Sequence, residues 1–392
     1  MARVSRADNS VVGRWWWSVD RWTLAALIAL VGVGYMTAFA ATPATTMSLT
    51  DPHTLITIKQ IVYLALAAMA MIAASMLDLQ QVKLASLGVG IVFLLLTAFT
   101  LVHGVVIAGG RRWIALPGFT IQPAEFLKPA LIVVTAWLLA ERRRSPGFAG
   151  MWAALGLNGI VLLILLKQPD IGSMLLVGST GFAQLVLDGI ALGWVVTGCL
   201  GLAGTLAAAI IFIPHVHARF ELFIHPARDN AYQALTALSA FGNGGLWGRG
   251  PGEGQVKHFL PDARADFVFA VVGEEFGLII CLAIVALFAF IVLRGLLRVR
   301  RESDLFVALA ASGLLVSFGL QAFVNMASSL SLIPTKGMTL PFISYGGSAV
   351  LAIGLHCGFL LALTRRRQGY FVARTLLDEP LFTLPKRQGG AA

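Results

Sequence analysis

The residue best placed to do chemistry is Asp266. It ends a polar segment of residues 215–266 and comes directly before the apolar run 267–293, so we expect it at the surface of a membrane. Carboxylates at a membrane edge are rare because lipid solvates charge poorly, and those that occur often belong to functional sites. Asp266 is therefore our candidate catalytic residue.

Basic residues gather on the same expected side of the membrane as Asp266. Topology favours lysine and arginine on the cytoplasmic side, although outer loops tolerate single ones. Because these residues adjoin glycine, tryptophan and proline, we interpret them together as a cationic basin for an anionic ligand such as a phosphate-bearing lipid. The set includes Arg111, Arg112, Lys128, Lys167, Arg219, Arg228, Arg249, Lys257, Arg264 and Lys336.

The segment between residues 109 and 130 combines charge with a helix-start signal. Pro123 suits the first turn of a helix, and Glu125 and Lys128 then share one face of it near the membrane surface. Arg112 and Trp113 precede this helix and form a pair that is common at membrane interfaces. The sequence leaves open whether these residues bind a ligand or belong to an ordinary interfacial helix with a local ion pair.

Residues 167–170 predict a short turn on the same side, with Gln168 and Asp170 as its polar candidates. An aspartate directly before a helix commonly accepts a hydrogen bond from the backbone of the first turn. We favour this capping role for Asp170 over a role in binding.

The polar segment 215–266 contains a helix signal. Asp229 can cap a helix whose apolar positions Tyr232, Leu235, Leu238 and Phe241 follow helical spacing. This stripe can lie on the membrane or on the helix bundle.

A loop with seven glycines follows, at residues 242–254. It lacks the G-x-G-x-x-G register and the preceding strand of a dinucleotide fold, so we exclude a nucleotide site. Arg249 and Lys257 are available there to a polar ligand. His215 and His217 have no third ligand at fixed spacing, so we expect no metal site from them.

The apolar run after residue 266 carries a stripe of small residues, Ala270, Gly273 and Gly277, that lets another helix pack closely beneath the carboxylate. Glu274 and Glu275 lie deeper in this run. Because an ionised carboxylate is costly in lipid, we expect both to face the protein interior and to be protonated, hydrogen-bonded or matched to a cation. Our first interpretation of this pair is structural.

The last outer loop, from Leu332, holds two prolines and a Gly346–Gly347 pair at the start of the final apolar run. Irregular backbone at membrane depth survives only where protein or water lines it, so we expect this loop to border a cavity. Lys336, Ser344 and Tyr345 can point into it.

The elements that must position these residues are membrane helices. Hydrophobic residues make up 58% of the 392 and charged residues only 12%, and apolar runs of this kind predict helices, not β-barrel strands. We expect an all-α membrane domain of ten helices at residues 22–364, between tails at 1–21 and 365–392. The runs fall near residues 22–41, 55–77, 84–107, 127–140, 149–166, 171–188, 190–213, 267–293, 305–328 and 340–363.

The positive-inside rule sets the orientation. A cytoplasmic amino terminus also places the clusters Arg142–Arg144, Arg294–Arg301 and Arg365–Arg367 inside, so both tails are expected in the cytoplasm. We read the first run as an uncleaved helix. The three cysteines lie in apolar runs, which favours packing over disulfides or redox chemistry.

Several of these segments together resemble the SEDS family of bacterial peptidoglycan polymerases, which includes RodA, SpoVE and FtsW. The likeness runs from the first span to Arg367. The most specific matches are Arg112–Trp113 with QPAEFLK, QPDIGS at residues 168–173, AYQALTALSAFGNGGLWGRG, FLPDARADFVFAVVGEEFG and PTKGMTLPFISYGGS. Within the family, the WWW-x-x-DRW opening and the lysine in LIPTKGMTLPFISYGG are most similar to the FtsW branch.

The resemblance implies a ten-helix enzyme that polymerises lipid II on the outer face of the bacterial cytoplasmic membrane, at the division septum. Its expected partners are a class B penicillin-binding protein transpeptidase and other division proteins, with no nucleic acid. The essential aspartate of the family falls on Asp266. The family usually reads His-Thr-Asp at this place, whereas this chain has Arg264, Ala265 and Asp266, so the neighbouring hydrogen bonds must differ.

Extending a glycan requires a base for the acceptor hydroxyl group and cations for the departing pyrophosphate, so Asp266 is the expected base. No cofactor is required by this scheme, although a divalent cation, Mg²⁺ or Mn²⁺, can assist. The residues that we expect to bind the substrate or its pyrophosphate are Arg112, Trp113, Glu125, Lys128, Gln168, Asp170, Arg249, Lys257, Lys336, Ser344 and Tyr345.

Three other functions stay open at this stage. A lipid II flippase would use the same cavity and cations to carry a head group across the membrane, a polymerase of the RodA type would serve cell elongation, and a scaffold would have no activity. A flippase should carry polar groups at mid-membrane, where Glu274 and Glu275 are the obvious candidates.

Overall fold

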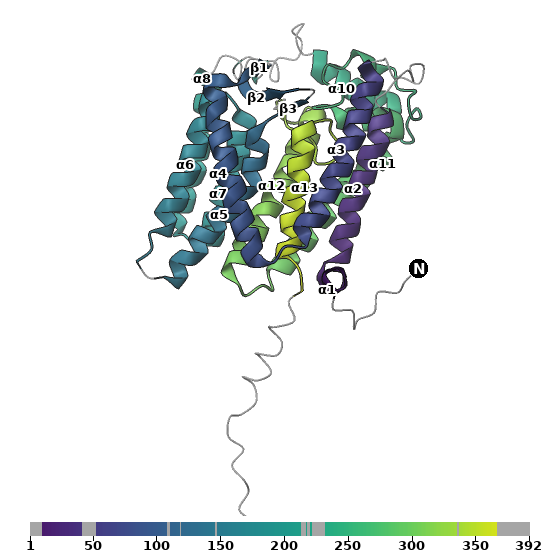
Figure 1. Cartoon of the computed structure of the whole chain (residues 1–392). Helices are drawn as coiled ribbons and strands as arrows, with labels where there is room; N and C mark the ends of the chain where they lie inside the picture. The colour runs from purple at the N-terminus through teal and green to yellow at the C-terminus, as the bar shows by residue number, and fades with distance from the viewer. Residues whose placement is uncertain are drawn as a thin grey trace, which may run out of the picture.

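The computed structural model describes residues 10–40, 52–107, 110–117, 119–145, 147–212, 217, 220–221, 232–334 and 337–366. These form a bundle of helices that run side by side (Figure 1). One end of the bundle, which we call the outer end, carries a small sheet and the helix α10, and the other end carries α1. The helices are α1 Val11–Ser18, α2 Arg21–Ala40, α3 Pro52–Ser75, α4 Leu79–His103, α5 Pro123–Arg144, α6 Gly150–Lys167, α7 Ile171–Leu187, α8 Leu192–Phe212, α10 Tyr232–Gly244, α11 Val268–Val299, α12 Leu305–Ser329 and α13 Gly347–Leu363, with a 3₁₀ turn at Val256–Phe259.

Seven helices in the described part of the chain are long and apolar enough to cross a membrane: α2, α3, α4, α5, α6, α11 and α12. The apolar helices α7, α8 and α13 occupy the remaining predicted runs. The helical membrane architecture is thus confirmed, while the crossing of the membrane by all ten stays a prediction. The described ends of the chain meet opposite the outer end, where the backbone N–H of Arg366 donates to the carbonyl oxygen of Ser18 at 2.8 Å.

The centre of the bundle is formed by α5, α12 and α13, whose side chains are mostly buried on all sides. By contrast, most of α4 and α6 is open to the surroundings, as expected for helices that face lipid. Large side chains such as Phe306, Phe318 and Phe359 are fully buried between the helices. The candidate site therefore rests on a rigid helical base.

The prediction of an all-α chain is wrong in one segment. β1 Val105–Ile107, β2 Gly110–Leu116 and β3 Phe119–Ile121 form an antiparallel sheet in the order β1-β2-β3. Trp113 pairs with Val105, and Ile114 pairs with Ile121. The strands are short and largely exposed, so their sequence lacks the alternation of apolar and polar residues that signals a half-buried strand.

The predicted stripe of small residues is confirmed as a close helix contact. A Cβ atom on Gly273 would lie 2.3 Å from the ring of Phe241, and one on Gly244 would lie 2.0 Å from the carbonyl oxygen of Gly273. Ala270 packs in the same contact, where α10 lies against α11. The apolar positions Tyr232, Leu235 and Leu238 of α10 face outward instead.

Gly277 interrupts α11 with φ 80° and ψ 178°. The glycine-rich loop fills this interruption: the N–H groups of Arg249 and Gly250 donate to the carbonyl oxygens of Glu274 and Glu275 at 2.9 Å each. In return, the N–H of Leu278 donates to the carbonyl oxygen of Gly245 at 3.0 Å. The loop thus replaces the hydrogen bonds that the helix loses at its break.

Candidate functional site

Asp266 lies in a turn that ends directly before α11, as predicted from the change in hydropathy. Its backbone N–H donates to the carbonyl oxygen of Asp262 at 3.0 Å. Its side chain is partly exposed, and Gly337, with φ 64°, is so placed that a Cβ atom there would lie 3.6 Å from its Oδ2. Asp266 is thus partly exposed at the outer end, and its carboxylate borders the last outer loop.

Ser344 and Tyr345 come from that loop and bind the Asp266 turn. The buried Ser344 hydroxyl donates to the carbonyl oxygen of Ala265 at 2.5 Å and accepts from the N–H of Leu340 at 2.8 Å. The N–H of Tyr345 donates to the carbonyl oxygen of Arg264 at 2.7 Å. Ser344 therefore uses its hydroxyl to hold the turn in place.

A pocket beside the turn is lined by Arg264 and Tyr345 and by α2 and α3 residues, including Gln60. Burial raises the pKa of the Tyr345 phenol, with Tyr63 adding to the rise and Arg264 opposing it. The predicted cavity next to the last outer loop is thus present. Its lining combines polar side chains with apolar ones such as Ile56 and Val268.

Arg112, Gln168 and Asp170 form a second cluster. The Arg112 guanidinium donates to the carbonyl oxygens of Gln168 and Pro169 at 3.1 and 2.6 Å and lies 3.6 Å from the Asp170 carboxylate. Asp170 also accepts from the N–H of Ser173 at 3.2 Å, so its predicted capping role is confirmed. Trp113 follows on β2 and is half-buried.

The side-chain amide of Gln168 is buried and donates to Thr100 Oγ1 at 2.6 Å and to the carbonyl oxygen of Thr97 at 3.0 Å. Gln122 links this cluster to the last helix: its side chain donates to Asp170 at 3.3 Å and its backbone N–H donates to Ser348 Oγ at 3.2 Å. Ser348 lies close in sequence to Tyr345. The two clusters are therefore joined through the start of α13.

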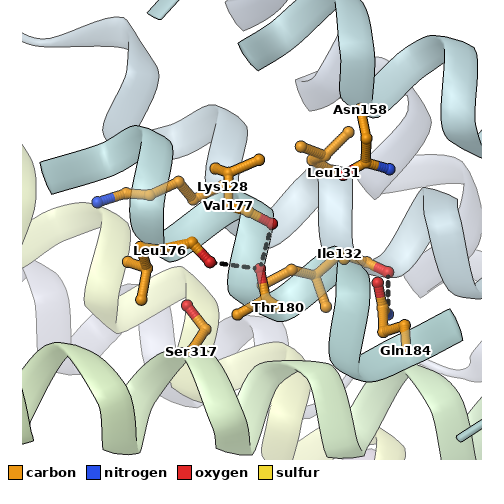
Figure 2. A pocket seen from close by; sticks show the side chains of 10 residues that line it. Lys128, Leu131, Ile132, Asn158, Leu176, Val177, Thr180, Gln184 and Ser317 are labelled. Atoms are coloured by element: carbon orange, nitrogen blue, oxygen red, sulfur yellow. Dashed lines mark hydrogen bonds between the residues drawn. The ribbon is translucent and has the colours of Figure 1, made fainter. Parts of the chain in front are cut away.

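Glu125 and Lys128 form the predicted ion pair on α5, with Lys128 Nζ 2.8 Å from each carboxylate oxygen. Both are buried. Lys128 also borders a pocket between α5, α6, α7 and α12, and Figure 2 shows its side chain extending away from Asn158 and Gln184. The Asn158 amide donates to Thr135 Oγ1 at 2.9 Å and the Gln184 amide donates to the carbonyl oxygen of Ile132 at 2.8 Å, so each joins its helix to α5.

The two glutamates of α11 face the protein interior, as predicted. Glu274 is fully buried and accepts from the N–H groups of Gln255, Val256 and Lys257 at 2.7 to 2.9 Å and from the Asn243 amide at 2.8 Å. Such a carboxylate, bound by several donors, fixes the loop that leads to the Asp266 turn. The expectation that Glu274 is hydrogen-bonded inside the protein is confirmed.

Lys257 and Arg249 are engaged within the chain. The buried Lys257 amine contacts Glu275 and donates to the carbonyl oxygen of Ala40 at 2.7 Å. Arg249 donates to the side chain and backbone of Asn243 at 2.7 and 2.8 Å. A role in ligand binding stays a prediction for both residues. Arg249 is exposed, whereas Lys257 is buried.

Lys336 lies outside the described residues, as do His215, Arg219 and Arg228. Within the described part of the chain, no three or more His, Cys, Asp or Glu side chains come together as metal ligands. Sequence reasoning overlooked Asn325, Gln321 and Gln60, which contact the turn or its loop. The sequence contained a signal for them, because an amide side chain within an apolar membrane helix is costly unless it has a hydrogen-bond partner.

Comparisons with known proteins agree with this architecture. Residues 21–369 match the model of a family described as cell cycle protein, FtsW/RodA/SpoVE. The chain is 39% identical over 373 residues to a probable peptidoglycan glycosyltransferase FtsW of Caulobacter vibrioides, covering 94% of this chain and 95% of that protein. It is 36% identical over 319 residues to a protein of the same name from Geobacter metallireducens, covering 79% and 85%.

Solved structures are similar over most of the chain. The rod shape determining protein RodA of Thermus thermophilus has a TM-score of 0.66 at 25% identity, covering 89% of this chain and 97% of that one. A chain from a study of "structural coordination of polymerization and crosslinking by a peptidoglycan synthase complex" has a TM-score of 0.71 at 25% identity, covering 88% and 97%. The predicted resemblance is confirmed, and this chain belongs to the FtsW/RodA/SpoVE family of cell cycle proteins.

Proposed function

We propose that this chain is a peptidoglycan glycosyltransferase that polymerises lipid II into β-1,4-linked glycan strands at the outer face of the cytoplasmic membrane. The observation that carries the proposal is the position of Asp266: a partly exposed residue on a turn that the last outer loop and α12 hold at the outer end of the bundle. The names of the similar proteins support the same activity.

In the proposed reaction, Asp266 accepts the proton of the 4-hydroxyl group on the acceptor sugar. The oxygen of that hydroxyl group forms a bond to the anomeric carbon of the growing strand at the same time. The bond from that carbon to the lipid pyrophosphate breaks, and the electron pair leaves with undecaprenyl pyrophosphate. One displacement inverts the α-linked donor to a β-linked product, so a single catalytic carboxylate suffices.

The pyrophosphate needs cations, and we propose Arg112, Lys128 and Lys336 for this task. Arg112 and Lys128 are held by carboxylates, Asp170 and Glu125. Paired cations of this kind are fixed in place before the ligand binds, so they lose little side-chain entropy on binding it. If a divalent ion takes part, it would bind mainly through the pyrophosphate oxygens with one or two carboxylates, as Mg²⁺ commonly does.

The similarity to FtsW proteins supports a role in septal cell-wall synthesis, with a class B transpeptidase as partner. The test uses the purified full chain with that transpeptidase and fluorescent lipid II. We expect glycan strands on a gel and release of undecaprenyl pyrophosphate. Transfer of head groups across a vesicle membrane with no polymer formed would instead indicate a flippase. If the protein showed neither activity, the result would indicate a scaffold.

A further inference from the structure

Asn325 lies near the carboxyl-terminal end of α12 and is fully buried. Its amide nitrogen donates to two backbone carbonyl oxygens, that of Asp266 at 3.1 Å and that of Met338 at 2.6 Å. The planar amide group has two hydrogens in fixed directions, so both bonds form only when the two carbonyl groups have one relative position. Asn325 thus joins the candidate catalytic turn to the last outer loop.

The oxygen atom of the same amide group lowers the stability of the fold. This atom, Oδ1, is buried without a hydrogen-bond partner in the described structure. A buried acceptor without a donor destabilises a fold, and an apolar side chain of similar size would avoid that cost in a helix bundle. The Asn325 amide therefore adds little to the stability of the fold. Its two donated hydrogen bonds are the feature that needs an explanation.

Those two bonds fix the surroundings of the Asp266 carboxylate. Asp266 and Met338 are far apart in sequence, and Gly337, next to Met338, borders the Asp266 Oδ2 atom. A shift of the loop relative to the turn would therefore change what faces the carboxylate. Ser329, one turn further along α12, also reaches the Asp266 carbonyl oxygen, at 3.5 Å.

We propose that Asn325 is a positioning residue for the glycosyl transfer, which holds the Asp266 backbone and the segment Gly337–Leu340 in register so that the carboxylate meets the acceptor hydroxyl group. This inference rests on the proposed function. It assigns Asn325 no contact with substrate, and its effect passes through Asp266.

Gln321 supplies a matched control. It lies one turn earlier on the same helix, is buried, and donates to the carbonyl oxygen and hydroxyl of Thr339 at 3.0 and 3.3 Å. These hydrogen bonds hold the same loop without reaching Asp266. Replacing Gln321 tests the anchoring of the loop, whereas replacing Asn325 tests the connection between the loop and the turn.

The experiment compares wild type, Asn325→Ala, Gln321→Ala and Asp266→Asn in lipid II polymerisation by the full chain with its transpeptidase. Because small misplacements of a catalytic group are costly, Asn325→Ala should lower kcat by about tenfold to a hundredfold. KM for lipid II should stay close to the wild-type value, and the acid side of the pH–rate profile should move. Gln321→Ala should keep the wild-type profile.

Three results would count against a positioning role for Asn325 or against the proposed function. A wild-type rate and profile in Asn325→Ala would overturn the inference, as would equal losses in both variants with unchanged pH profiles, which indicate loop anchoring only. Should the alanine variant fail to fold, Asn325→Asp keeps the side-chain volume and replaces the donors by acceptors, and the same outcomes apply to it. Full polymerisation by Asp266→Asn would instead overturn the proposed function itself.

Discussion

At the scale of single residues, the bundle pairs buried charged side chains with one another, although some buried polar atoms, such as Asn325 Oδ1, have no hydrogen-bond partner in the described structure. Lys257 and Glu275 show this most clearly, because both side chains are almost inaccessible and they contact each other. The sequence predicted that Glu275 would be protonated, hydrogen-bonded or matched to a cation, and the structure pairs it with Lys257. Its partner comes from a loop residue whose position depends on how the glycine-rich loop folds onto α11.

Replacing only one member of this pair should lower the stability of the protein more than replacing both. Lys257→Met leaves the Glu275 carboxylate buried and unpaired, so we expect a loss of about 3 to 5 kcal/mol in stability. Thermal unfolding in detergent measures the loss. The double variant Lys257→Met with Glu275→Met should recover most of it, and a double variant as unstable as the single one would contradict the importance of the pair.

At the scale of elements, hydropathy and small-residue spacing predicted the apolar helices, the start of α11 and its close contact with another helix, which the structure shows to be α10. The break at Gly277 and the sheet β1–β3 were not predicted. Both depend on partners distant in sequence: the break is stabilised by the loop at residues 245–250, and the strands are too short and exposed to leave a pattern. For the candidate site, the position of Asp266 before α11, the helix cap at Asp170 and the inward orientation of Glu274 could be predicted from local signals. Asn325 required the fold, since its two acceptors lie in separate loops.

The glycine-rich loop gives a test of the element that supports the Asp266 turn. Gly248 has φ 83°, and a Cβ atom there would lie 2.2 Å from the carbonyl oxygen of Glu275. Gly248→Ala should therefore displace the loop from the helix break, lowering both the melting temperature and the polymerisation rate. Gly242→Ala is the control, because a Cβ atom on Gly242 of α10 meets nothing within 4 Å. An unchanged melting temperature in Gly248→Ala would refute the close contact.

At the scale of the whole molecule, ion pairs join the first and later helices at the end opposite Asp266. Asp20, before α2, binds Arg294 and Arg298 of α11 at 2.9 Å. Burial alone would raise the pKa of the Asp20 carboxyl, but hydrogen bonds from Arg294 and Thr23 and the charge of Arg298 lower it from 3.8 to about 2. The arrangement holds the first membrane helix against the helix that follows Asp266.

This lowered pKa predicts a pH dependence. The pairing stabilises the folded state by about 2 kcal/mol above pH 4, and this contribution is lost as the pH falls from about 4 toward 2, because the unfolded chain binds the proton first. Asp20→Asn should therefore lower the melting temperature at neutral pH, and its difference from wild type should shrink below pH 4. A difference that is constant down to pH 2 would contradict this account.

The central claim is that the Asp266 carboxylate removes the acceptor proton, and one comparison tests it most directly. Asp262 belongs to the same turn, is exposed and has φ 53°, a conformation that asparagine tolerates. We expect Asp266→Asn to lower lipid II polymerisation by about two to four orders of magnitude while the protein stays folded. Asp262→Asn should keep the wild-type rate. Glycan synthesis at the normal rate by folded Asp266→Asn protein would contradict the account.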